Sequence, residues 1–206
     1  YVKRYLEDTS MAVRIVVDRS ASMRFASEGQ PSKYLQACRV AARIAYLVIK
    51  ERDAAGLAVT SGDDTLWLPA KSTEAHLVNI LRALVGREPD STDNLQPCLK
   101  AVLDRNERRG IVAVVSDLMF EPKPAQRQMA RLAAQGHEVL LMQLRDPTEE
   151  DFPFNRWVQF GDLEHSSVRH RVDAVLLKTI YREEYQALQE DWRRWAVRAG
   201  VEPMVI

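Results

Sequence analysis

Short runs of apolar residues alternate along this chain with longer stretches in which apolar positions recur every three or four residues. The runs predict buried strands, and the recurring positions predict helices with one apolar face. The predicted strands cover residues 13–18, 56–60, 65–68, 111–116 and 138–144, with weaker strand signals at 2–7, 157–160, 168–172 and 203–206. The predicted helices cover residues 33–51, 72–85, 94–106, 125–134 and 173–199. Alternating strands and helices predict a mostly parallel sheet that is covered on both faces.

Two local patterns refine this outline. A turn sequence at 61–64 separates two of the strands and predicts a hairpin, which would add one antiparallel edge strand. Residues 86–93 and 146–154 are expected to be loops. The last helix should face the core with one apolar stripe, formed by Leu177, Tyr181, Leu188, Trp192 and Trp195. The expected fold class is α/β, with a Rossmann-like doubly wound sheet, one antiparallel edge strand and helices on both faces.

The length of 206 residues suits one domain, at roughly 100–200 residues per domain. We therefore expect a single domain over residues 1–206. The sequence begins without Met and in the middle of a pattern, so we expect it to be a fragment of a longer chain that lacks its N-terminal part.

Net charge, the length of the apolar runs and the two cysteines indicate which partners and which compartment to expect. There are 29 basic and 29 acidic residues, so net charge gives no reason to expect nucleic acid or an anionic membrane as partner. No apolar run approaches the ~18 residues of a membrane span, so we expect no membrane segment in this chain. Cys38 and Cys98 do not form a CxxC motif, and we expect both to be buried free thiols in a reducing compartment, the cytoplasm.

Oxygen-bearing side chains follow three of the predicted elements. Asp18, Ser20 and Ser22 come directly after one buried strand, Thr92 lies in a polar loop, and Asp117 follows the next buried parallel strand. Ligands of open parallel sheets bind outside the carboxyl ends of the strands, where these segments should meet. Carboxylate and hydroxyl oxygens are hard ligands that suit Mg²⁺. The pattern therefore predicts a metal-centred binding site more than a covalent catalyst.

The motif Asp18-Arg19-Ser20-Ala21-Ser22-Met23, a later Thr and an Asp after a following strand resemble the metal-ion-dependent adhesion site (MIDAS) of von Willebrand factor A (vWA) domains. The chain is most similar to a bacterial branch known as domain of unknown function 58. The similarity covers nearly the whole chain and rests on several segments in order: 1–8, 91–93, 116–118, 136–139, 146–147 and 151–154.

This resemblance implies a vWA-like fold and a metal site formed by Asp18, Ser20, Ser22, Thr92 and Asp117. The two serines would bind the metal directly, and the other three residues directly or through water. The metal would be Mg²⁺, with Mn²⁺ or Ca²⁺ as alternatives. Two features depart from the common pattern: Asp90-Ser91 replaces Gly-Gly before the threonine, and Leu118 stands where many adhesion domains have Gly.

The charge count of such a site predicts its partner. Serine and threonine are neutral ligands, so at most two carboxylates oppose the divalent charge, and an octahedral ion keeps open or water-filled positions. An acidic residue of another protein would supply the missing ligand and charge. The resemblance further implies that this partner is a MoxR-type AAA+ ATPase or its client, with this chain as adaptor or co-chaperone.

Two other functions stay open. A phosphatase or phosphoacceptor could be built on a similar sheet, but a haloacid-dehalogenase-type enzyme needs a second Asp where Ser20 stands, and no GxSxG or GxxxxGK motif occurs. We therefore expect no enzymatic activity. The third possibility is a structural domain whose metal site is degenerate and empty.

Overall fold

The computed structural model describes residues 11–61, 64–86, 88–89, 95–105, 107–154, 157–161 and 169–206. Its main sheet has six strands in the order β3-β2-β1-β4-β5-β8. Only the edge strand β3 runs antiparallel to its neighbour, while the other pairs are parallel. The predicted α/β, doubly wound class with one antiparallel edge strand is therefore confirmed. The strands are β1 (Ala12–Val17), β2 (Ala54–Ser61), β3 (Asp64–Lys71), β4 (Ile111–Ser116), β5 (Glu138–Gln143) and β8 (Glu202–Val205).

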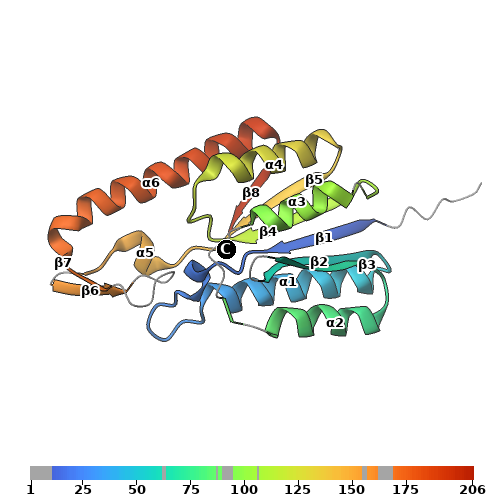
Figure 1. Ribbon diagram of the computed structural model, residues 1–206, viewed down its shortest axis with the longest axis horizontal. Helices are drawn as coiled ribbons and strands as arrows, with labels where there is room; N and C mark the ends of the chain where they lie inside the picture. Colours follow the sequence, from blue (N-terminus) through green and yellow to red (C-terminus); the bar gives the residue numbers. More distant parts are fainter. Residues whose placement is uncertain are drawn as a thin grey trace, which may run out of the picture.

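Helices cover both faces of this sheet (Figure 1). One face packs against α1 (Lys33–Lys50) and α2 (Glu74–Val85). The other packs against α3 (Gln96–Arg105), α4 (Pro122–Ala134) and α6 (Ala174–Ala199). Local sequence sets the N-terminal ends of three of these helices. The side chains of Ser32, Thr73 and Asp173 each accept a backbone N–H and so act as the N-caps of α1, α2 and α6.

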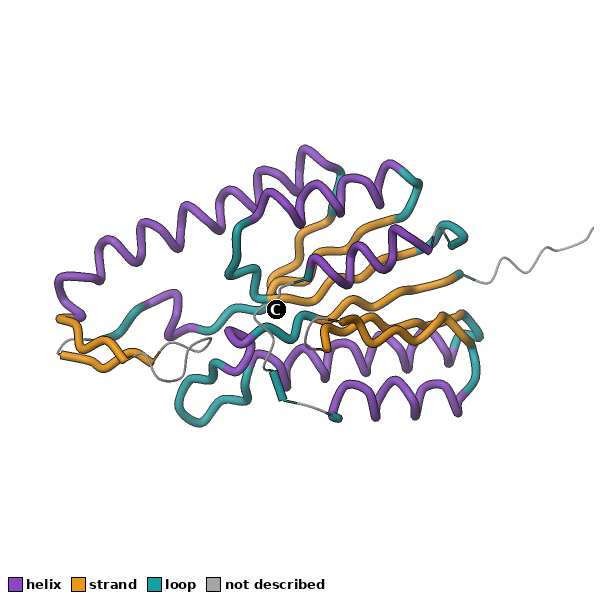
Figure 2. Tube along the Cα trace, viewed as in Figure 1, coloured by secondary structure: helices purple, strands orange, loops and turns teal. Residues whose placement is uncertain are grey.

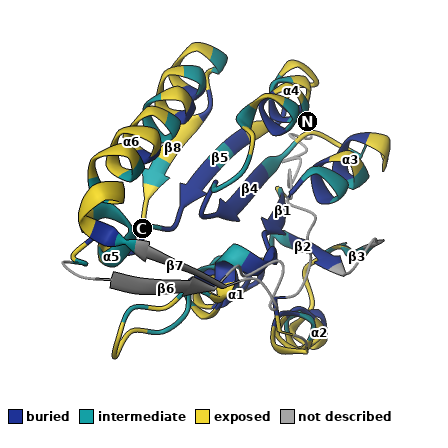
Figure 3. Ribbon diagram, turned by 60° about the vertical axis from the view of Figure 1, so that its left-hand side comes forward, coloured by how far each residue is buried: buried dark blue, intermediate teal, exposed yellow. Residues whose placement is uncertain are grey.

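The alternation of side chains along β1 creates two core layers. Ile15 and Val17 point into the layer beneath α1 and α2, whereas Val16 points into the layer beneath α3, α4 and α6. Buried residues accordingly fill the central strands, and exposed ones lie on the outer faces of the helices (Figure 3). Both cysteines are buried and free, as predicted.

One predicted loop contains a short helix. Residues 146–154 were expected to be irregular, but α5 (Pro147–Asp151) begins there. Asp146 caps it by accepting the N–H of Thr148 at 2.8 Å, and Pro147 suits a first helical position, which needs no N–H donor. One and a half turns are too short to produce a periodic apolar pattern. The predicted strand at 2–7 lies outside the described residues.

The longest helix, α6, extends past the carboxyl edge of the main sheet (Figure 1). At its far end, β6 (Trp157–Gly161) and β7 (Arg169–Asp173) pair as a separate antiparallel ribbon. The apolar stripe predicted for α6 is correspondingly only partly right, because Trp192 is buried whereas Leu177 is 37% exposed. Among the described residues, no helix is both long and apolar enough to cross a bilayer.

Gly110 marks a close approach of two chain segments before β4. A β-carbon at this position would collide with the carbonyl oxygen of Ala12, in the neighbouring strand β1. Glycine therefore lets β4 lie directly beside β1, and this pairing brings the residues after the two strands together.

Candidate metal centre

The residues that follow β1 and β4 lie side by side. Val17 is opposite Val115, and the backbone N–H of Asp18 donates to the carbonyl oxygen of Val115 at 2.9 Å. The structure thus brings Asp18, Ser20, Ser22 and Asp117 to one edge of the sheet, where the loops after the strands converge near the C-terminus (Figure 2). Thr92, the fifth residue of the predicted site, lies outside the described residues.

Asp18 is fully buried, and both of its carboxylate oxygens are hydrogen-bonded. Oδ1 accepts the backbone N–H of Ser20 at 2.9 Å, and Oδ2 accepts the hydroxyl of Ser116 at 2.5 Å. The same Ser116 hydroxyl oxygen accepts the N–H of Leu118 at 2.9 Å. These bonds fix the orientation of the Asp18 carboxylate before any ligand arrives.

The hydroxyl oxygens of Ser20 and Ser22 lie 3.1 Å apart. A short 3-10 helix, η1 (Ala21–Arg24), curls the chain so that both side chains meet. Adjacent ligands of an octahedral Mg²⁺ at about 2.0–2.1 Å are separated by about 2.9 Å, so this pair has the spacing of two neighbouring ligands. The residues therefore fit a hard divalent cation.

Asp117 is held by an ion pair that the sequence did not predict. Its Oδ2 accepts a hydrogen bond from the ammonium of Lys33 at 2.7 Å, and its Oδ1 accepts the N–H of Met119 at 3.2 Å. The same ammonium donates to Glu149 Oε1 at 2.7 Å. Burial by itself would lower the pKa of Lys33, but Asp117 and Glu149 outweigh it and raise this pKa. Lys33 is therefore a charged group with 0% exposure.

Sequence reasoning missed Lys33, Glu149 and Ser116. Lys33 was assigned only as the first residue of a helix, and Glu149 fell in a predicted loop. One signal was available for Lys33: a cation at a helix N-terminus opposes the helix dipole, which suggests that something else determines its position. Nothing local distinguishes Glu149, which approaches Lys33 only through the packing of α5.

Leu118 has a left-handed backbone with φ 58°, a conformation that favours glycine. Its place after Asp117 is where many adhesion domains carry Gly. Here the strained turn is held from two sides, because the Leu118 N–H donates to Ser116 Oγ and the Leu118 carbonyl oxygen accepts the indole N–H of Trp192. The side chain is buried in the layer beneath α4 and α6. The rest of the fold thus keeps Asp117 in place without a glycine.

Burial, together with the nearby charge of Asp117, raises the pKa of Asp18 from 3.8 to about 6. A carboxyl whose pKa is higher in the folded than in the unfolded state binds more protons when folded, so its stabilising contribution is present below about pH 4 and is lost as the pH rises through about 6. In EDTA, the free energy of unfolding of the wild type relative to Asp18→Asn should fall by roughly 2 kcal/mol between pH 4 and 7. Urea unfolding at four or five pH values measures this difference, and a flat difference would show that Asp18 ionises normally.

Among the described parts of the chain, no group of three or more His, Cys, Asp or Glu side chains could hold a metal ion. A cation at this edge would therefore depend on two hydroxyls and two carboxylates rather than on a cluster of charges. Such a donor set suits Mg²⁺ and leaves coordination positions for water or an external oxygen.

Comparisons with known proteins identify relatives whose own functions are not described. The uncharacterized protein Rv1480 of Mycobacterium tuberculosis is 27% identical over 173 residues, which cover 82% of this chain and 53% of that protein. The chain thus spans about half the length of the curated relatives it matches.

Solved structures resemble this fold over nearly its whole length. The conserved hypothetical protein BatB of Bacteroides thetaiotaomicron aligns with a TM-score of 0.61 and 18% identity, covering 95% of this chain and 90% of that one. An aerotolerance-related membrane protein of Bacteroides fragilis aligns with a TM-score of 0.59 and 18% identity, covering 95% and 91%. At this level of identity, the likeness concerns the fold alone.

The family assignment comes from the sequence itself. The profile of the family described as "Protein of unknown function DUF58" matches residues 1–194, which is most of the chain. This agrees with the bacterial branch that the sequence motifs indicated. The chain belongs to the DUF58 family.

Proposed function

We propose that this chain is a metal-dependent protein-interaction module with a MIDAS. A Mg²⁺ ion, or Mn²⁺ or Ca²⁺ in its place, would be held by Ser20, Ser22, Asp18 and Asp117, with Thr92 completing the site. When bound, the ion would offer an open position to a carboxylate oxygen of a partner protein. The observation that carries the proposal is the 3.1 Å separation of the two serine hydroxyl oxygens beside two buried aspartates.

The proposed coordination supports an acidic partner. Asp18, Asp117 and Glu149 carry three negative charges beside the one positive charge of Lys33, so a bound Mg²⁺ would bring the net charge of these groups to zero. A partner's Asp or Glu would then bind through the open coordination position of the ion.

The site does not favour covalent catalysis. Asp18 is buried, and each of its oxygens accepts a hydrogen bond, so it is a poor nucleophile. The residue two places later, where a phosphatase of the haloacid-dehalogenase type needs an acid, is Ser20. We therefore propose a binding role without an enzymatic step.

The proposed partner is a MoxR-type AAA+ ATPase or one of its clients, with this chain as adaptor or co-chaperone. This part rests on the family resemblance. The proposed location is the cytoplasm, which suits two buried free thiols.

Calorimetric titration with MgCl₂ tests the metal site directly. The wild type should bind Mg²⁺, and Asp18→Asn or Ser20→Ala should weaken binding by on the order of 10-fold or more. Asp104→Asn, at an exposed position of α3, is the matched control and should bind as the wild type does. A pull-down with a MoxR-type ATPase should then need Mg²⁺ and be lost in EDTA and in Asp18→Asn.

The alternative function is that of a structural domain whose metal site stays empty. Lys33 forms an ion pair with Asp117, so part of the negative charge at this edge of the sheet is compensated without a metal. A structural domain with an empty site would give no heat with Mg²⁺, Mn²⁺ or Ca²⁺ and no difference between the wild type and Asp18→Asn. That result would overturn the proposed function.

A further inference from the structure

Part of α6 presents apolar residues that the main sheet does not cover. Leu177 and Ile180 are 37% and 59% exposed. Tyr181, one turn after Leu177, is half-buried. Leu188 continues the same side of the helix after two more turns. An uncovered apolar strip of this kind is typical of a docking surface.

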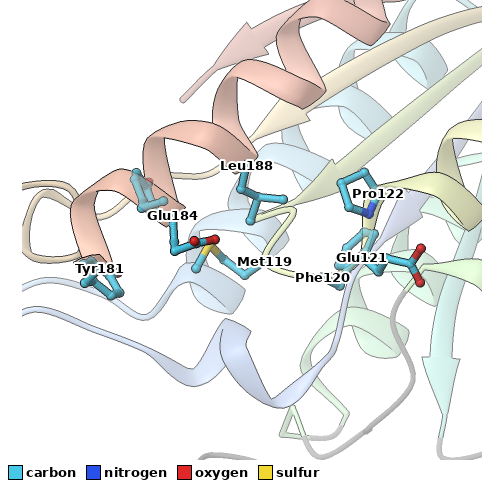
Figure 4. Close-up of a pocket in the computed structure, with 8 residues that line it drawn as sticks. Met119, Phe120, Glu121, Pro122, Tyr181, Glu184 and Leu188 are labelled. Carbon is cyan, nitrogen blue, oxygen red and sulfur yellow. The ribbon is translucent and has the colours of Figure 1, made fainter. Parts of the chain in front are cut away.

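The strip leads into a groove of about 360 Å³ between α6 and the segment that follows β4. Met119 and Phe120 line one side of this groove, and Tyr181 and Leu188 line the other (Figure 4). Phe120 is fixed from behind by an edge-to-face contact with Trp192, at 5.7 Å between ring centroids. The apolar wall is therefore built on rigid parts of the fold.

Acidic side chains accompany this apolar wall. Among the described residues that line the groove, the charged ones are Glu121 and Glu184, and both are exposed. One comes from each side of the groove. In Figure 4 the Glu184 carboxylate lies beside Met119, whereas the Glu121 carboxylate points away from α6 at the edge of the groove. A bulky apolar group seated against Met119 and Leu188 would bring a neighbouring cation close to Glu184, and a neighbouring anion would be disfavoured by both acidic side chains.

The groove and the candidate metal centre are linked by the segment that follows Asp117. Met119 lines the groove, and its backbone N–H donates to Oδ1 of Asp117 at 3.2 Å. Leu118, between them, is anchored to Trp192. One partner segment could therefore contact the metal centre and the groove at the same time.

We propose that this groove is a second docking site for the protein partner and that it takes a bulky apolar side chain next to a Lys or Arg. The partner's acidic residue would occupy the metal centre, while this apolar-basic pair lies against α6. The inference rests on the proposed function for the partner's identity. Binding in the groove itself uses no metal.

The test is NMR titration of labelled protein in EDTA with acetyl-Phe-Lys-amide and acetyl-Phe-Glu-amide. The lysine peptide should shift resonances of Met119, Phe120 and Leu188, and the glutamate peptide should bind about 10-fold more weakly. In Glu121→Lys/Glu184→Lys this preference should reverse. Glu183→Lys, an exposed change that does not line the groove, is the matched control and should keep the wild-type preference.

The outcomes separate this proposal from the metal site. Absence of groove shifts with both peptides overturns the docking site, and equal affinities in all variants overturn its charge selectivity. Neither result bears on Mg²⁺ binding by Asp18 and Ser20. Conversely, a failed Mg²⁺ titration beside a positive peptide result would overturn the proposed function and leave a metal-independent peptide site.

Discussion

Replacing Lys33 by methionine is expected to lower the free energy of unfolding of the metal-free protein by about 3–5 kcal/mol. The change removes a buried ammonium that donates to Asp117 and Glu149, both at 2.7 Å. Asp117 would then be a buried carboxylate without its counter-ion, next to Asp18. For a chain of this size the melting temperature should fall by on the order of 10 °C, measured by circular dichroism in EDTA.

Two further variants make this prediction specific to the ion pair. Lys50→Met changes an exposed lysine of the same helix and should stay within about 0.5 kcal/mol of the wild type. Adding Asp117→Asn to Lys33→Met should recover part of the lost stability, because the unpaired charge is then gone. A Lys33→Met protein as stable as the wild type would contradict the structure.

The same variant also reports on the proposed metal. Mg²⁺ and the Lys33 ammonium compensate overlapping negative charge, so Lys33→Met should gain more stability from added MgCl₂ than the wild type does. The measurement is the shift in melting temperature between EDTA and a fixed MgCl₂ concentration. Equal shifts in both proteins would indicate that Lys33 and the ion do not compete.

Replacing Trp192 by alanine is expected to destabilise the protein by about 3–5 kcal/mol. Trp192 is only 1% exposed, and it packs edge-to-face against Phe120 and Trp195, at 5.7 and 5.9 Å between ring centroids. Its indole N–H also donates to the carbonyl oxygen of Leu118 at 3.2 Å. The substitution would leave a cavity beneath α6 and an unpaired carbonyl group in the strained turn after Asp117.

Urea unfolding of Trp192→Ala, Trp192→Phe and Arg198→Ala measures this effect. Trp192→Phe should cost less than Trp192→Ala, since it keeps most of the packing and loses the hydrogen bond. Arg198→Ala, at an exposed position of the same helix, should change stability by no more than about 0.5 kcal/mol. A loss below about 1 kcal/mol for Trp192→Ala would mean that the site collapses around the smaller side chain.

Much of the architecture was predictable because it depends on local patterns. The apolar runs at β1 and β4 and the periodic stripe of α1 indicated their elements to within a residue or two. The hairpin between β2 and β3 followed from its turn residues. The short helix α5 was not predicted, because it has too few residues to show a helical period. The exposure of the first half of α6 was not predicted either, because its apolar stripe indicated packing against the sheet, and the helix extends past the sheet.

For the candidate site, sequence reasoning selected Asp18, Ser20, Ser22 and Asp117, and the structure brings these four together. Their grouping follows from a general rule, that parallel strands present their carboxyl ends at one edge. Thr92 stays a prediction. What the rule could not supply was the set of groups around the carboxylates. Ser116 directly precedes Asp117 but donates to Asp18, and Lys33 and Glu149 come from other parts of the chain.

The sequence by itself therefore determined the fold class, the chain segments that reach the carboxyl edge and the oxygen chemistry available there, because strand and helix periodicity and ligand type are local properties. Tertiary structure alone decided that Lys33 is buried against Asp117 and Glu149 and that α6 borders the same edge with an acidic, apolar groove. Both depend on the packing of helices against the sheet. A side chain's charge environment is set by which distant segments that packing brings within a few ångströms, and no local pattern records it.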